Sequence, residues 1–154
     1  MRTAVKKISL LPLLALLGCA GGAHQKIVPG KTTSAELTKQ LGAPLAVGSS
    51  PLGEGAELKT YPDCEFQLEN EMVTGKFCKP PETQRSLQYW RQLWRGEKTT
   101  WEPLPGQSGL HGKERFVLSA PSLKRSVIYD SAVDQVTAVV EYSSTSVKGA
   151  SDGK

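Results

Sequence analysis

Cys64 and Cys78 are the two residues whose type and spacing most directly predict a chemical bond. The third cysteine, Cys19, follows a leader that predicts export. An even number of remaining cysteines in an oxidising compartment favours a disulfide. Residues 64–69 alternate apolar and polar side chains like a half-buried strand, and residues 72–78 can return antiparallel after a turn at Asn70-Glu71.

The register of this hairpin needs one irregularity to bring the cysteines together. A two-residue turn places Leu68 opposite Val73 and Cys64 opposite Phe77, so Cys78 lies one step too far along. An extra residue bulged near Gly75 would place the cysteines opposite each other, and glycine is common at bulges. The alternative is a metal site, but we expect no histidine near the two cysteines, and two cysteines alone do not fill a zinc site.

The N-terminus has the pattern of an export signal. Arg2, Lys6 and Lys7 precede an apolar run over residues 8–17, which is shorter than the roughly 20 residues of a membrane-spanning helix. The run ends in Leu16-Leu17-Gly18-Cys19, which resembles a bacterial lipobox. That resemblance implies cleavage before Cys19 and lipidation of its sulfur and new amine. An ordinary signal with a chance cysteine is the alternative. Residues 1–18 are thus predicted to be a lipoprotein signal peptide, and the Gly-rich residues 19–31 a lipidated flexible tether.

Charge argues against a nucleic-acid partner. The formal charge is +4, but without the three basic residues of the leader 16 basic and 15 acidic residues remain. The predicted partner is instead a membrane, reached through acyl chains on Cys19, because two or more chains hold stably at a bilayer. Ala20 resembles the sorting default for the outer membrane, periplasmic face, although inner-membrane and cell-surface locations stay open.

The other candidate chemistry is weak, and we predict no catalytic residue, no cofactor and no metal site. Residues 106–114 superficially resemble a phosphate loop, but Glu114 stands where a hydroxyl should bind Mg²⁺. Ser108 and His111 share a Gly-rich stretch without an orienting carboxylate. Asp130 and Asp134 are typical of turn chemistry.

The pattern of elements predicts a small α+β domain over residues 32–142, with one or two short helices packed on antiparallel β-hairpins. Thr33 and Glu36 form a capping box before a helix over 34–41, which Gly42 and Pro44 end. Residues 46–56 and 102–113 are predicted to be loops and residues 143–154 a disordered tail. The further elements predicted are a helix over 82–95 and strands over 58–61, 115–119, 126–130 and 136–142.

The motif Thr33-x-x-Glu36-Leu37-x-x-x-Leu41-Gly42-x-Pro44, followed by an aromatic strand and a hairpin, resembles the SmpA/OmlA (BamE-like) family of outer-membrane lipoproteins over residues 30–78. The resemblance implies a pair of helices on a three-stranded antiparallel sheet and a role beside outer-membrane assembly machinery. Gly30 lies three residues before Thr33, whereas the family glycine lies two before. Residues 82–142 again offer a helix and strands, so halves over 32–81 and 82–142 would be two degenerate helix-plus-sheet units.

Large aromatic residues supply the candidate protein-binding surface, Tyr61, Trp90, Trp94 and Trp101. For Tyr61 and Trp101 the alternative is a place in the same hydrophobic core as the helix. The stripe of Leu87, Trp90 and Trp94 is typical of a helix's core face, and its alternative is a basic aromatic helix resting on lipid headgroups. Together these features predict a non-catalytic envelope lipoprotein that binds another envelope protein. A periplasmic inhibitor or ligand-binding module is the alternative.

Overall fold

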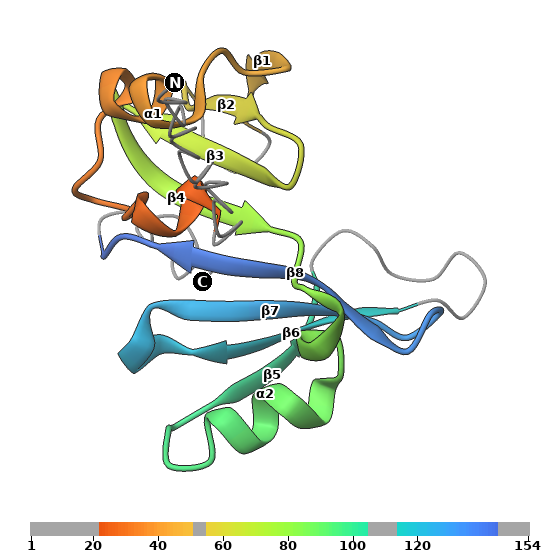
Figure 1. The fold of residues 1–154 in the computed structure, drawn as a ribbon. Coiled ribbons are helices and arrows are strands. Elements are labelled where there is room, and N and C mark those ends of the chain that lie inside the picture. The colour runs from red at the N-terminus through yellow and green to blue at the C-terminus, as the bar shows by residue number, and fades with distance from the viewer. Residues whose placement is uncertain (1–21, 51–54, 105–113, 145–154) are drawn as a thin grey trace, which may run out of the picture.

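The computed structural model describes residues 22–50, 55–104 and 114–144, and its main feature is one antiparallel sheet (Figure 1). The sheet has eight strands in the order β1-β2-β3-β4-β8-β7-β6-β5. The α+β class is confirmed, with strand far exceeding helix. The strands are β1 (Ala46–Ser49), β2 (Glu57–Thr60), β3 (Cys64–Glu69), β4 (Met72–Cys78), β5 (Thr100–Pro103), β6 (Arg115–Ala120), β7 (Arg125–Asp130) and β8 (Gln135–Tyr142).

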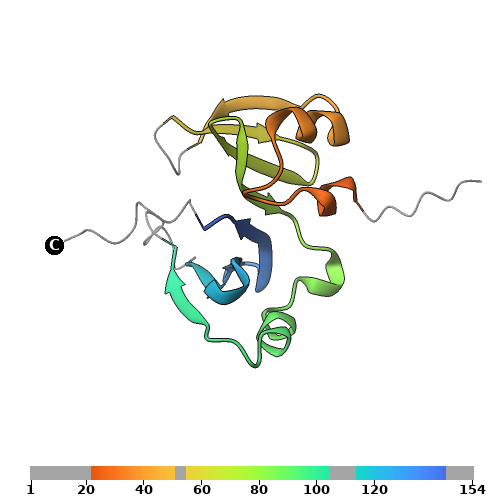
Figure 2. The same cartoon turned by 90° about the vertical axis from the view of Figure 1, so that its left-hand side faces the viewer.

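The chain order divides the sheet into two halves. The first half is α1 (Ser34–Leu41) followed by β1–β4, and the second is α2 (Leu87–Leu93) followed by β5–β8. In each half consecutive strands pair as neighbours, and the last strands of the two halves, β4 and β8, pair with each other at the centre. Figure 2 shows α1 with the upper half and α2 with the lower half. No helix among the described residues has the length and hydropathy to cross a bilayer.

Each half has its own hydrophobic core. The first gathers Ile27, Leu37, Phe66 and Val73, all with an exposed fraction of 0%. The second gathers Trp90 and Trp94 from the α2 region with Leu118, Val127 and Val136 from the strands. Burial of large apolar side chains is the main stabilising contribution to such halves.

The start of α1 forms as its sequence predicts. The Thr33 hydroxyl accepts a hydrogen bond from the Glu36 N–H at 3.3 Å, and the Glu36 carboxylate accepts one from the Thr33 N–H at 2.8 Å. Both bonds satisfy backbone donors that the first turn of a helix leaves without partners. Gly42 ends the helix with φ +80°, a conformation that favours glycine.

Two predicted loops contain edge strands instead. β1 lies within residues 46–56 and β5 overlaps residues 102–113. All four residues of each strand are exposed, so neither has the alternating burial that would make it visible in the sequence. Pairing with β2 and β6 determines them. The helix predicted over 82–95 is shorter, with a 3-10 turn η2 (Glu82–Gln84) before α2.

The two predicted flexible ends are partly folded. A 3-10 turn η1 (Ala23–Lys26) and the fully buried Ile27 lie within the predicted tether. The Gly30 N–H donates to the Val73 carbonyl at 2.7 Å, which ties this segment to β4. At the other end Ser143 is buried and its N–H donates to the Thr74 carbonyl at 2.9 Å. Residues 145–154 lie outside the described part of the chain.

The first half differs in detail from the fold implied by the family resemblance. Its described residues form one α-helix and four strands, rather than two helices and three strands. In the second half β8 also departs from simple alternation, because the register with β7 shifts between Ile128 and Tyr129. Val136 and Val139 therefore both pack on the second core, whereas uninterrupted alternation over residues 136–142 would place Val136 on the same face as Ala138, Val140 and Tyr142.

Candidate binding cleft at the junction of the two halves

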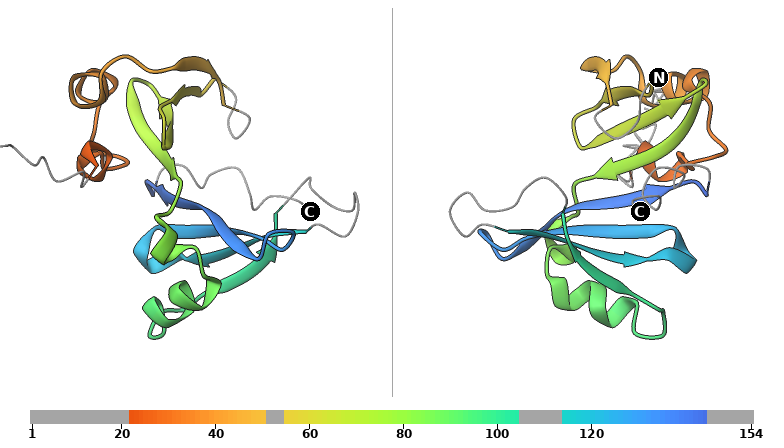
Figure 3. Two further views of the ribbon diagram at one scale, coloured as in Figure 1. Left: turned by 45° about the vertical axis from the view of Figure 1, so that its right-hand side comes forward. Right: turned by 180° about the vertical axis from the view of Figure 1, so that it is seen from behind.

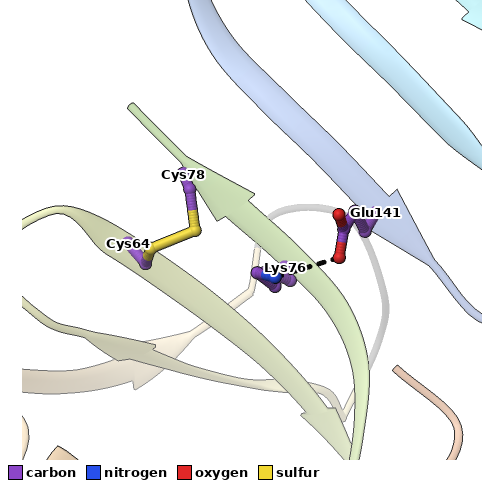
Figure 4. The surroundings of a disulfide bond; sticks show 4 residues. All are labelled: Cys64, Lys76, Cys78 and Glu141. Atoms are coloured by element: carbon purple, nitrogen blue, oxygen red, sulfur yellow. Dashed lines mark hydrogen bonds and ion pairs between the residues drawn. A yellow bond between two sulfur atoms is a disulfide. The ribbon is translucent and has the colours of Figure 1, made fainter. Parts of the chain in front are cut away.

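A row of three charged side chains crosses the junction of the halves. Lys76 on β4 lies opposite Glu141 on β8, and Glu141 lies opposite Arg125 on β7. Residues in direct register share a face of a sheet, so the three side chains meet. The Lys76 Nζ is 3.0 Å from Glu141 Oε2 (Figure 4). An Arg125 guanidinium nitrogen is 2.7 Å from Glu141 Oε1.

Lys76 depends on this arrangement more than Arg125 does. Its side chain is only 8% exposed, whereas that of Arg125 is 48% exposed. A buried ammonium loses hydration, and a paired carboxylate offsets that loss. Glu141 thus holds a cation from each half at the centre of the sheet.

The disulfide lies beside this row. Cys64 on β3 pairs in register with Cys78 on β4, and their sulfurs are bonded (Figure 4). The register shifts between Gln67 and Leu68, so that Leu68 faces Val73 while Gln67 faces Gly75 and Thr74 is the extra residue. The predicted disulfide and the predicted bulge near Gly75 are both confirmed. The turn at Asn70 and Glu71 has positive φ at both residues, +50° and +62°, as a type I′ hairpin turn requires.

One histidine approaches the disulfide, contrary to the sequence argument that none is near. A ring nitrogen of His24, on η1, lies within 4.8 Å of the sulfurs of Cys64 and Cys78. The fold of residues 22–31 against β4 brings it there. Both sulfurs are bonded to each other, so neither is a thiolate that could bind a metal ion.

A cleft of about 720 Å³ opens over the junction. Its lining comes from both halves, and η1 lies beside the point where β4 meets β8 (Figure 3). Apolar contributions include Pro80, Trp90 and Val139. The charged lining residues are five cations and one carboxylate, Lys31, Lys76, Lys79, Lys124, Arg125 and Glu141.

The cations of the cleft fall into two groups. Lys76 and Arg125 share Glu141. Lys31, Lys79 and Lys124 are exposed, and none of them forms an ion pair with a carboxylate that the structure describes. The cleft therefore has an excess of positive charge, and concave surfaces of one sign attract ligands of the opposite sign.

Three of the four predicted protein-binding aromatics lie inside the two halves. Tyr61 is 6%, Trp90 4% and Trp94 2% exposed. Their polar atoms have internal partners: the Tyr61 hydroxyl donates to the Gly42 carbonyl at 3.2 Å, and the Trp90 Nε1–H donates to the Gln84 carbonyl at 2.6 Å. Such burial is typical of core residues, as the helical stripe of Leu87, Trp90 and Trp94 predicts.

Trp101 is the member of that set that a partner could reach. Its side chain on β5 is 39% exposed. It stacks on Phe116 with ring centroids 4.9 Å apart, and the Arg91 guanidinium lies 5.3 Å from its ring centroid. Stacking and cation–π contacts hold the indole in place while leaving part of its surface to solvent.

Asp130 and Asp134 act in the turn between β7 and β8, as predicted. Asp130 Oδ1 accepts a hydrogen bond from the Ala132 N–H at 2.9 Å. Asp134 has φ +52°, and its Oδ1 accepts a hydrogen bond from the Tyr129 hydroxyl at 2.6 Å. That hydrogen bond is the main cause of the raised pKa of Tyr129.

The predicted lipidation site, Cys19, lies outside the described residues together with its leader. Ser108 and His111, the pair that the sequence argues against as nucleophile and base, also lie outside them, in the segment 105–113. Sequence reasoning missed the cleft, because its halves meet through a pair 65 residues apart, Lys76 and Glu141. The available signal was a lysine at an inward position of a strand, two residues before Cys78.

No family model matches the chain, and no curated protein or solved structure matches it either.

Proposed function

We propose that the protein is a lipid-anchored lipoprotein of the cell envelope, held in the outer membrane with its folded part in the periplasm. The observation that carries this proposal is the lipobox-like sequence Leu16-Leu17-Gly18-Cys19. Cleavage before Cys19 and acylation of that residue would fix the chain to the bilayer without a spanning helix.

The short distance along the chain between Cys19 and the first folded residues supports a position of the folded part close to the membrane. Packing begins soon after Cys19, with η1 at Ala23–Lys26 and the buried Ile27. Three residues separate Cys19 from Ala23, and an extended chain advances about 3.5 Å per residue. The folded part would therefore lie within about 15 Å of the lipidated residue.

We further propose that the protein works without catalysis, as a binding or scaffold module for another envelope protein. The cleft at the junction, together with the exposed face of Trp101, supplies surfaces for such a partner. The resemblance over residues 30–78 makes outer-membrane assembly machinery the proposed partner.

The topology supports a finer proposal, that the chain is a pair of degenerate helix-plus-sheet units. In each half one helix is followed by four strands that pair in chain order. The first strand of each half, β1 or β5, lies at an edge of the sheet, and the last, β4 or β8, lies at the centre. A helix over one face of its own hairpins in each unit would explain the two separate cores.

Two measurements test the anchored-adaptor proposal. Mass spectrometry of the N-terminal peptide should find cleavage before Cys19 and added acyl chains. Crosslinking in membranes, followed by capture of the protein, should recover an envelope protein with the wild type and lose it with Cys19→Ser. An unmodified Cys19 on a chain that keeps residues 1–18 contradicts the anchor, and identical captured proteins with both chains contradict the need for it.

The cleft also favours a second candidate, a periplasmic inhibitor or ligand-binding module. Its volume of about 720 Å³ lies within the range of sites that hold small molecules. Native mass spectrometry of the purified protein should then find a retained small ligand or a stoichiometric enzyme complex. The adaptor proposal expects the mass of the chain with its acyl groups only.

A further inference from the structure

We propose that the cleft at the junction binds a segment of the partner protein that carries several carboxylates, in an extended conformation. This inference rests on the proposed binding function and names the chemistry of its partner. It follows from the charges of the cleft, from their origin in both halves, and from the apolar floor between them.

The exposed cations of the cleft come from three separate segments. Lys31 precedes α1, Lys79 directly follows β4, and Lys124 lies between β6 and β7 in a turn with φ +53°. Residues from both halves thus border one cleft. Charges on three segments suit a ligand whose negative groups are spread along its length, rather than a single small anion.

The cleft already holds one carboxylate. Glu141 accepts contacts from Lys76 at 3.0 Å and from Arg125 at 2.7 Å, so cations on β4 and β7 satisfy a carboxylate from β8. Lys31, Lys79 and Lys124 border the same cleft without such a partner among the described residues. Carboxylates from a second chain can make the equivalent contacts with these three, and charge-assisted hydrogen bonds are stronger than neutral ones.

The floor of the cleft suits a peptide with apolar residues between its acids. Pro80, Trp90 and Val139 contribute to the lining. An extended segment directs successive side chains to opposite sides, so one set can contact the floor while the other meets the rim. A peptide that alternates acidic and apolar residues can therefore contact both the cations of the rim and the apolar floor.

The test uses the full chain purified in a neutral detergent and a synthetic peptide of 12 residues in which glutamate alternates with leucine. Calorimetry should detect binding of this peptide and none of the peptide with glutamine for glutamate. The Trp90 indole N–H resonance should shift on binding, because this side chain lines the cleft. Added salt should weaken the affinity, since exposed charges are screened.

Matched variants locate the binding. The triple variant Lys31→Gln, Lys79→Gln, Lys124→Asn should weaken the affinity about tenfold, from three rim charges of modest individual effect. Its control is Lys39→Gln, Lys98→Gln, Arg95→Gln, which removes the same charge at exposed residues outside the cleft lining and should leave the affinity unchanged. Arginine at the three rim positions should preserve binding.

The outcomes separate this inference from the proposed function. No binding of the acidic peptide, equal loss in both triple variants, or binding only to vesicles of anionic phospholipid overturns the inference, whatever membrane crosslinking captures. Peptide binding that is weakened about tenfold in the rim variant and unchanged in its control supports it, even where Cys19 proves unmodified. If the rim variant fails to fold, the Trp90 resonance of the unmodified protein still decides, because an unshifted indole signal at saturating peptide overturns the cleft as the site.

Discussion

In the first half of the sheet a disulfide between Cys64 and Cys78 ties β3 to β4 beside a core of Ile27, Leu37 and Phe66. The second half has no cysteine, and its core is built on Trp90 and Trp94. The first core also draws on residues before α1, whereas the second uses its own helix and strands. Similar topologies are therefore stabilised by different means.

The difference teaches how a small half-sheet can compensate for a small core. A unit of this size has few core residues, and together they bury little apolar surface. A covalent link or unusually large side chains are therefore needed to stabilise its fold. A cross-link lowers the entropy of the unfolded chain. A tryptophan removes more apolar surface from water than any aliphatic residue.

The largest expected effect is removal of the aromatic bulk from the second half. Trp94→Ala should lower the free energy of unfolding by about 3–5 kcal/mol, because the lost side chain is 2% exposed and leaves a cavity. Urea denaturation followed by circular dichroism measures this loss. Leu93→Ala on the same turn is the control, since Leu93 is 55% exposed and should change stability by less than about 0.5 kcal/mol. Equal effects at both positions would contradict the second core.

Removal of the covalent link should have the next largest effect. The variant Cys64→Ala, Cys78→Ala frees a loop whose ends are 14 residues apart, and should lose about 3 kcal/mol of stability. Hydrogen exchange should show faster opening of β3 and β4 than of β6 and β7. Uniformly faster exchange across the sheet would instead mean that the two halves unfold as one unit.

The charged row between the halves should contribute less than either core. Glu141→Gln leaves the ammonium of Lys76 nearly buried without its carboxylate, and should cost about 2 kcal/mol. The control is Glu102→Gln, an exposed position on β5, which should be close to neutral. Denaturation midpoints of the two variants measure the difference, and equal midpoints would show that Lys76 reaches water when Glu141 is changed.

The sequence predicts the contacts that lie close together in the chain. The capping box joins residues 3 positions apart, and the cysteine hairpin with its bulge joins residues 14 apart. Hydrophobic alternation, glycine and turn residues report such local geometry directly. The core position of Trp90 and Trp94 also follows from helical spacing alone.

The contacts that make the cleft could not be predicted in this way. The pairing of β4 with β8 joins residues such as Lys76 and Glu141 across 65 positions, and no local pattern specifies which strands meet. The edge strands β1 and β5 could not be predicted from hydrophobic alternation, because all their residues are exposed. Tyr61, a predicted surface residue, is buried between β2 and β3 because its ring packs edge-on against Phe66 of β3, with ring centroids 5.6 Å apart.

The smallest expected effect on stability comes from the N-terminal cap of α1, which also makes the stability of the first half depend on pH. Thr33→Ala should cost about 1 kcal/mol, because the N–H of Glu36 loses its hydrogen-bond acceptor. Thermal denaturation measures this cost at pH 7, with Thr38→Ala, at an exposed position of the same helix, as the control.

The same cap should respond to acid in a defined direction. The hydrogen bond from the Thr33 backbone N–H, then that of its side chain, lowers the pKa of Glu36 below its ordinary value of 4.5. A carboxyl group whose pKa is lower in the folded state stabilises the fold fully above its unfolded pKa, and this contribution is lost as the pH falls through the folded pKa. Glu36→Gln should therefore lower the melting temperature at pH 7 and lose that difference from wild type in acid below pH 4.5. A difference that persists unchanged in acid would mean that the amide fails in the cap for steric reasons rather than for lack of charge.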